Sequence, residues 1–87
     1  MPRLMLVDDE PNILNSLRRA LNAMPADTFG GHPTVETFTA PAHALARAAE
    51  VAFDLVISDY RMPGMDGVSF LERLIELQPN ISRMILS

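Results

Sequence analysis

The chain has 87 residues, with eleven acidic residues, seven arginines, no lysine and a net charge of −4. This length fits one domain or part of one, and 48% hydrophobic with 21% charged residues is an ordinary globular composition. Cysteine is absent, which excludes disulfides and thiolate metal sites, and no basic stripe favours nucleic acid as a direct partner. No apolar run is long enough to span a membrane and no signal-peptide pattern is present, so we expect a cytoplasmic protein.

The first half of the chain predicts two strands, each followed by a helix. An apolar strand over residues 3–7 leads into Asp8, Asp9 and Glu10, and Pro11 suits the first turn of a helix. That helix is expected to end at Pro25 and to bury Ile13, Leu14, Leu17, Ala20, Leu21 and Met24. After a loop over residues 25–33, we expect an edge strand at 34–39. A second helix from Pro41 is expected to bury Ala42, Leu45, Ala46 and Ala49.

The second half repeats this alternation. The apolar residues 55–57 predict a strand buried on both faces, which ends at Asp59. Turn signals at 63–64 and 66–67 precede a helix that Asp66 is expected to cap and Pro79 to end. Its predicted apolar face consists of Val68, Leu71, Leu74, Ile75 and Gln78, widened by Phe70 and Leu77. A last buried strand is expected over residues 83–87.

Strands that alternate with helices indicate an α/β fold with a parallel sheet and right-handed crossovers. If the first and third strands are neighbours, Asp8, Asp9 and Asp59 share one small cleft at the carboxyl edge of the sheet. Each like-charged pair costs about 1 kcal/mol at 4 Å in water, so a cation is expected between them. Carboxylate oxygens are the ligands of hard divalent ions, and Mg²⁺ combines one or two of them with waters and a phosphate. A carboxylate beside Mg²⁺ is also a competent nucleophile toward phosphorus.

These features resemble the receiver domain of two-component response regulators. The similarity lies in the run Val7-Asp8-Asp9-Glu10, in residues 59–67 (Asp-Tyr-Arg-Met-Pro-Gly-Met-Asp-Gly), and in Ser87 at a strand end. The resemblance implies a flavodoxin-like, doubly wound parallel sheet, here cut to four strands in the order 2-1-3-4 with three helices. Residues 1–87 would then be a receiver domain that is incomplete at its C-terminus.

The resemblance also implies a role for each matching residue. Asp59 would be the phosphoacceptor, serving a sensor histidine kinase or a phosphotransfer protein, and Ser87 the hydroxyl that turns toward the phosphoryl group. Asp9 would be a direct ligand of Mg²⁺, Asp8 a ligand acting largely through water, and Arg61 a ligand through its backbone carbonyl. Glu10 is assigned mainly to the helix dipole, and the separated His32 and His43 are not expected to be ligands.

The sequence also departs from the family. The family's fifth strand carries a lysine that pairs with the phosphoryl oxygens, whereas this chain has no lysine, and Arg83 begins its strand at the wrong end. We therefore expect weaker phosphorylation than in a complete receiver. We also expect a homo-oligomer, formed through the unpaired apolar edge of the fourth strand.

Two other functions remain open at this point. One is a degenerate receiver that serves only as an oligomerisation or interaction module. The other is a Mg²⁺-dependent phosphohydrolase, although no second acid stands two residues beyond Asp59 and no capping domain is present. The leading interpretation is a phosphorylation switch rather than an enzyme.

Overall fold

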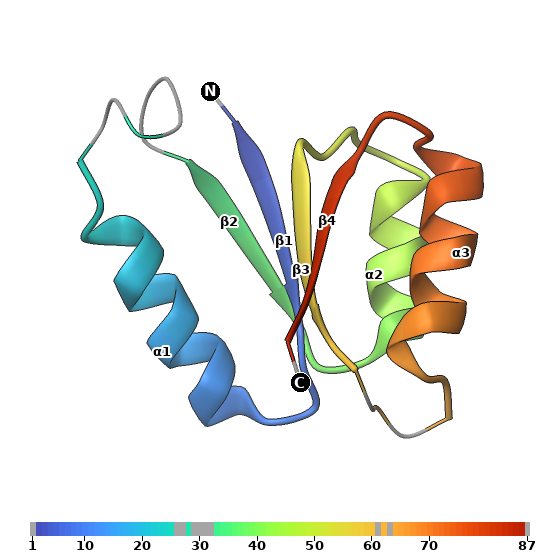
Figure 1. Ribbon diagram of the computed structural model, residues 1–87, viewed down its shortest axis with the longest axis horizontal. Coiled ribbons are helices and arrows are strands. Elements are labelled where there is room, and N and C mark those ends of the chain that lie inside the picture. The colour runs from blue at the N-terminus through green and yellow to red at the C-terminus, as the bar shows by residue number, and fades with distance from the viewer. Residues whose placement is uncertain (1, 26–27, 29–32, 61, 63, 87) are drawn as a thin grey trace.

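A computed structural model describes residues 2–25, 28, 33–60, 62 and 64–86. Four strands alternate with three helices along the chain: β1 Arg3–Val7, α1 Pro11–Asn22, β2 Thr34–Phe38, α2 Pro41–Ala48, β3 Leu55–Asp59, α3 Gly67–Leu77 and β4 Ser82–Leu86. The strands form one parallel sheet in the order β2-β1-β3-β4, so the predicted topology is confirmed (Figure 1). Among the residues that the structure describes, no helix has the length and apolar character needed to cross a bilayer.

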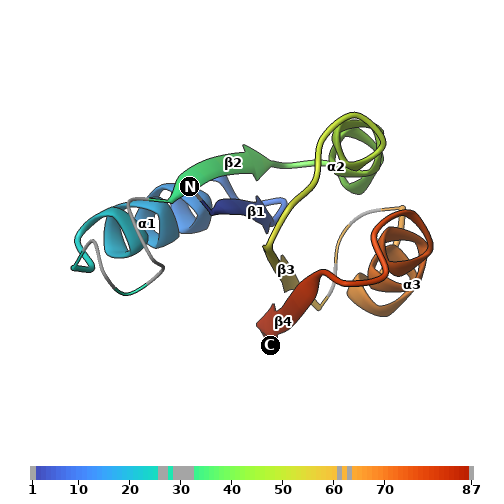
Figure 2. The ribbon, with the colours of Figure 1, turned by 90° about the horizontal axis from the view of Figure 1, so that it is seen from above.

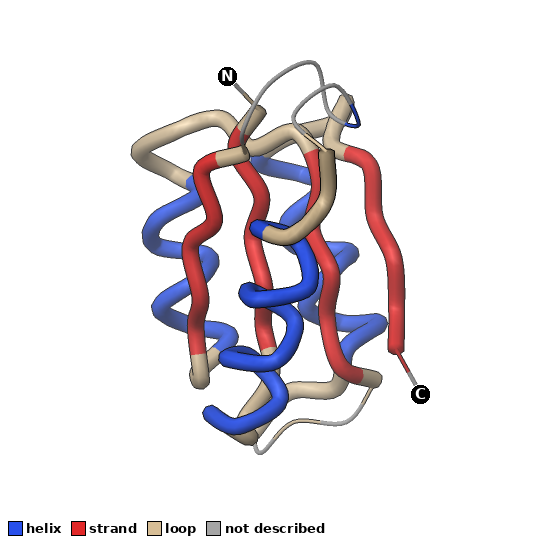
Figure 3. Tube along the Cα trace, turned by 90° about the vertical axis from the view of Figure 1, so that its left-hand side faces the viewer, coloured by secondary structure: helices blue, strands red, loops and turns tan. Residues whose placement is uncertain are grey.

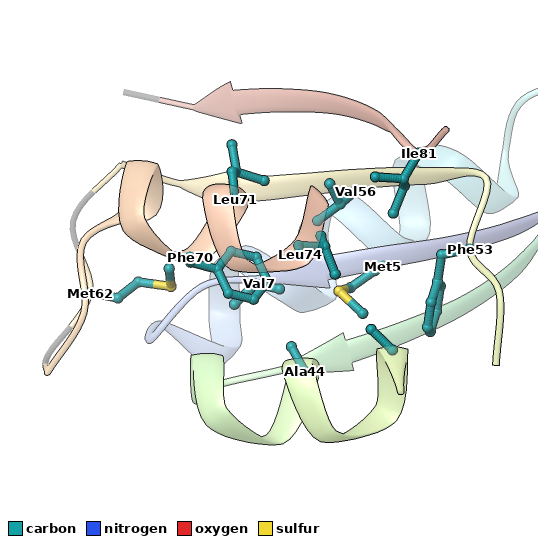
Figure 4. Packing of buried hydrophobic residues seen from close by; sticks show 11 residues of the cluster. Met5, Val7, Ala44, Phe53, Val56, Met62, Phe70, Leu71, Leu74 and Ile81 are labelled. Atoms are coloured by element: carbon teal, nitrogen blue, oxygen red, sulfur yellow. The ribbon is translucent and has the colours of Figure 1, made fainter. Parts of the chain in front are cut away.

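The sheet separates two apolar layers, because successive strand residues point to opposite faces. Figure 2 shows α1 on one face of the sheet and α2 with α3 on the other. In β1, Leu4 and Leu6 pack in the cluster that contains Leu14 and Leu21 of α1. Met5 and Val7 belong instead to the larger cluster with α2 and α3, where Figure 4 shows helix side chains facing those of the strands.

The predicted face of α1 is right at its centre and wrong at its ends. Leu14 and Leu21 are buried, whereas Ile13 is 44% exposed, and the helix ends at Asn22, ahead of an exposed Met24. Ala20 is exposed as well. Leu14, Leu17 and Leu21 form a narrow stripe at helical spacing, and Ile13 lies beyond its edge, about 40° from Leu17 and 100° from Leu14.

The predicted face of α2 is wrong except at Leu45, which packs against the larger core cluster. The buried residues are Pro41, Ala44 and Ala48; Leu45 is only half-buried, and the other expected residues, Ala42, Ala46 and Ala49, are exposed. Five of the ten residues 41–50 are alanine, so almost every stripe of this helix is apolar. The stripe that the fold uses places Ala44 and Ala48 in the larger core cluster with Met5 and Val7.

The predicted face of α3 is too wide. Gly67, Phe70, Leu71 and Leu74 are buried, but Val68 and Leu77 lie on the exposed side. Gln78, which was expected only to extend the apolar stripe, has a different role. Its side-chain amide donates to the carbonyls of Ala48 (2.9 Å) and Val51 (2.7 Å) and accepts from the backbone N–H of Phe53 (2.7 Å).

Candidate phosphoacceptor and metal site

The carboxyl ends of all four strands lie at one edge of the molecule, at the bottom of Figures 1 and 3. β1 and β3 are direct neighbours in the centre of the sheet, and Val7 is paired with Ser58. The next residue of each strand is an acid, Asp8 on one and Asp59 on the other. One oxygen each of Asp8, Asp9 and Asp59 lies within 4.8 Å of the other two. The structure therefore brings the three predicted acids together.

Asp8 is the most buried of the three, with 4% of its surface exposed, whereas Asp9 is exposed and Asp59 is half-buried. Asp8 Oδ1 accepts the backbone N–H of Glu10 at 2.9 Å. Burial raises the pKa of Asp8, the Glu10 N–H lowers it, and the negative charges of Asp59 and Asp9 raise it further; the net direction is upward. The site thus holds a carboxyl group whose charge no cationic side chain among the described residues compensates.

Asp59 is held by the backbone around it. Its Oδ1 accepts the backbone N–H of Tyr60 at 2.8 Å, and its own carbonyl accepts the hydroxyl of Ser58 at 3.0 Å. Ser58 is completely buried, so this hydroxyl is a fixed restraint rather than a solvated group. Sequence analysis missed Ser58, although a serine that interrupts a run of apolar strand residues is a signal for a specific hydrogen bond.

The loop that follows β3 is anchored at both ends. Met62 is buried and Met65 packs against the larger core cluster, so both side chains hold the loop against the core. Asp66 Oδ1 accepts the N–H of Ser69 at 2.7 Å, which confirms Asp66 as the N-cap of α3. Asp66 is thereby assigned to the helix and not to the acidic cluster.

Two of the predicted site residues, Arg61 and Ser87, lie outside the described residues, as does His32. His43 is exposed on α2. Within the described ranges, the three aspartates form the only group of candidate metal ligands. Arg83 is paired with Val56, two positions before Ser58, and therefore lies far from the carboxyl edge.

The three aspartates suit Mg²⁺ by chemistry and by position. All the donors are carboxylate oxygens, which hard cations prefer, and the group contains no nitrogen or sulfur that would favour zinc or copper. A mutual separation of up to 4.8 Å suits an ion that takes several of its ligands as water. Burial is the largest cause of the raised pKa of Asp8, and the negative charges of Asp59 and Asp9 add to it. A cation at the site would act in the opposite direction and lower this pKa.

Comparison with known proteins identifies one family. A model of the response regulator receiver domain matches residues 4–87. The chain is 29% identical over 86 residues to the C4-dicarboxylate transport transcriptional regulatory protein DctD of Rhizobium meliloti. It is 41% identical to an uncharacterized protein from Neptuniibacter caesariensis of known structure, with a TM-score of 0.87. It is 27% identical to a CheY-like response regulator receiver domain protein from Methanospirillum hungatei, with a TM-score of 0.82.

These matches cover nearly all of this chain but only part of each relative. The match to DctD covers 99% of this chain and 17% of DctD. The corresponding shares are 99% and 58% for the Neptuniibacter structure, and 98% and 62% for the Methanospirillum structure. The match therefore concerns the receiver part of these proteins.

Proposed function

The chain belongs to the family of response regulator receiver domains, and on that basis we propose that it accepts a phosphoryl group on Asp59 from a phosphohistidine. The donor is a sensor histidine kinase or a phosphotransfer protein, and the exchange takes place in the cytoplasm with Mg²⁺ present. The observation that carries the proposal is the meeting of Asp8, Asp9 and Asp59 at the ends of two neighbouring strands.

Asp8, Asp9 and Asp59 would hold the metal, together with the backbone carbonyl of Arg61 by analogy with the family. When bound, Mg²⁺ offsets the negative charge of the phosphoryl group and of the three carboxylates. The burial of Asp8 strengthens this interaction, because water screens a buried charge less than an exposed one.

Asp59 supplies the nucleophile. Its Oδ1 is taken by the N–H of Tyr60, and among the described residues no donor contacts the other oxygen, Oδ2. We assign Oδ2 as the attacking atom: an O–P bond forms as the P–N bond of the donor breaks, and the imidazole leaves as a neutral base after taking up a proton from solvent. Rigid attachment of Asp59 to a central strand orients the oxygen before the donor arrives. Ser87 is assigned, from the family pattern, as the hydroxyl that responds to the new charge.

The direct test is labelling by phosphoramidate with and without Mg²⁺, followed by intact-mass spectrometry. We expect Mg²⁺-dependent addition of one phosphoryl group, lost in Asp59→Asn and retained in Glu72→Gln, which changes an exposed acid on α3. Because the chain has no lysine, we expect labelling that is incomplete and short-lived. Absence of any labelling, or labelling that persists in Asp59→Asn, contradicts the proposal. Stoichiometric and long-lived labelling would show that the lysine is dispensable.

A second proposal concerns self-association through the edge of β4. This strand pairs only with β3 among the described strands, and Met84 (51%) and Ile85 (39%) are both substantially exposed on it. Unpaired apolar edges are templates for strand addition. Light scattering should therefore show a dimer or larger species, reduced by Met84→Lys. A monodisperse monomer at high concentration overturns this proposal and leaves the assignment of Asp59 unaffected.

A further inference from the structure

Gly67, the first residue of α3, lies directly against the tip of β3. A Cβ atom on Gly67 would come 2.4 Å from the carbonyl oxygen of Asp59 and 3.1 Å from both the Cα and the carbonyl oxygen of Tyr60. The first distance is shorter than any that real side chains tolerate, and all three neighbours are backbone atoms that cannot swing aside. Only glycine therefore fits between α3 and the phosphoacceptor.

The requirement at Gly67 is one of space and not of backbone conformation. The only described glycine with positive φ is Gly64, at +82°, whereas Gly67 adopts a backbone that any residue can take. Alanine is otherwise the better helix former. A short polar residue at this position would keep α3 intact but would force the helix away from the strand.

Hydrogen bonds connect Gly67 to the reactive carboxylate in two steps. The N–H of Gly67 donates to the carbonyl of Tyr60 at 2.7 Å, and the N–H of Tyr60 donates to Asp59 Oδ1 at 2.8 Å. On the other side, the hydroxyl of Ser58 holds the carbonyl of Asp59. The peptide between Asp59 and Tyr60 thus has Gly67 packed against its carbonyl, which also accepts the buried hydroxyl of Ser58. Its N–H holds one oxygen of Asp59, and the next carbonyl, that of Tyr60, is held by the N–H of Gly67.

We propose that Gly67 is a positioning residue for the phosphoacceptor: it admits the first turn of α3 onto the Asp59–Tyr60 peptide and so sets which oxygen of Asp59 faces the donor. This inference rests on the proposed function of Asp59. Movement of α3 and orientation of the carboxylate are then coupled through the backbone of Asp59 and Tyr60, with no side chain of α3 in between.

The test compares two glycine-to-alanine changes. Gly67→Ala adds a methyl group that meets Asp59, whereas Gly64→Ala adds one that has no heavy atom within 4 Å and only strains the backbone. At saturating Mg²⁺ and phosphoramidate, and well below both melting temperatures, we expect Gly67→Ala to lower the labelling rate about 10- to 100-fold, because reacting groups displaced by about 1 Å lose that much. Gly64→Ala should stay within about twofold of the unchanged protein, whatever stability it loses.

A second readout does not depend on labelling. The amide proton of Tyr60, hydrogen-bonded to Asp59, should shift upfield and exchange faster in Gly67→Ala than in Gly64→Ala, as measured by NMR without metal. Equal labelling rates together with an unmoved Tyr60 amide in Gly67→Ala overturn the proposal, as does equal slowing in both variants.

If Gly67→Ala does not fold, Ser58→Ala takes its place, since it frees the same peptide without adding an atom; unchanged labelling there also overturns it. Failure of the unchanged protein to be labelled refutes the function of Asp59, while the Tyr60 amide still decides the positioning.

Discussion

The two ends of the sheet differ in how their polar side chains are paired. At the amino end, the side-chain amide of Gln78 makes three hydrogen bonds to backbone groups, and Asp54 Oδ2 accepts the backbone N–H of Arg3 at 2.8 Å. At the carboxyl end, Asp8 is nearly as buried as the core and shares its cleft with two other carboxylates. At the amino end these polar side chains are paired with backbone groups of the protein. At the carboxyl end the three carboxylates have no cationic partner among the described residues.

This difference in pairing indicates which end of the sheet stabilises the fold and which end destabilises it. A satisfied amide network rigidifies the end that carries no chemistry. Uncompensated carboxylates destabilise the other end, and in the proposed function these same carboxylates bind the cation and accept the phosphoryl group. Changes to the Gln78 network at the amino end should therefore lower stability without affecting phosphorylation. Removal of a charge from the acidic cluster at the carboxyl end should raise stability without metal and impair Mg²⁺ binding.

The largest effect is expected at the amino end. Gln78→Leu leaves two carbonyls and one N–H without their partner. An unsatisfied buried group costs about 1–3 kcal/mol, and these partly buried groups fall at the low end of that range. We expect the free energy of unfolding to fall by about 3 kcal/mol in total, measured by urea denaturation. The exposed Glu76→Ala, on the same helix, is the control and should change little. A loss no greater than that of the control would show that water replaces the amide.

Next in size is the effect of the metal on the other end. A ligand that binds only the folded state, at a hundred times its dissociation constant, raises the free energy of unfolding by about 2.7 kcal/mol. We expect Mg²⁺ to approach this gain in the unchanged protein and to lose most of it in Asp59→Asn. Melting curves across a Mg²⁺ series, with Na⁺ at matched ionic strength, measure it. Equal stabilisation by both salts would mean screening rather than a site.

Without metal, Asp8→Asn is expected to raise the free energy of unfolding, by less than the changes above. Asparagine keeps an oxygen for the N–H of Glu10 and removes a charge that is buried and faces two others. The pKa of Asp8 is raised in the folded state, so its ionisation costs stability: the cost is absent below the unfolded value of about 3.8 and full above the raised folded value. Asp8→Asn should thus gain about 1 kcal/mol at pH 7 and nothing at pH 3, while losing Mg²⁺ binding. Destabilisation at pH 7 would contradict this account.

The sequence predicts the sheet and the meeting of the acids because both follow from strand order. Asp8 and Asp59 each come directly after an apolar strand, so any arrangement that pairs β1 with β3 brings them together. The face of α2 could not be predicted, since its alanines give no contrast between stripes. The role of Gly67 was also hidden, because closeness to Asp59 depends on the path of the intervening loop and leaves no periodicity in the sequence.

The smallest effect on stability is expected at Glu36, an acid that is paired with arginines, in contrast to Asp8. Glu36 on β2 is paired with Arg47 through Nε (2.8 Å) and also with Arg3. The hydrogen bond from Arg47 lowers the pKa of Glu36 against a smaller upward effect of burial, and Arg3 lowers it further. Its stabilising contribution is therefore present above the unfolded value of about 4.5 and is lost as the pH falls through the lowered folded value, the reverse of Asp8.

We expect Glu36→Gln to lose less than about 1 kcal/mol at pH 7 and nothing at pH 2, as measured by urea denaturation at both values. The loss should shrink at high salt, since these side chains are partly exposed and water and ions screen them. Relative to the unchanged protein, Asp8→Asn should become more stable as the pH rises and Glu36→Gln less stable. Plots of the free energy of unfolding against pH should therefore diverge from that of the unchanged protein in opposite directions. Parallel profiles would mean that both acids sense only the net charge of the chain, and the contrast between the compensated and uncompensated sites would then have no energetic basis.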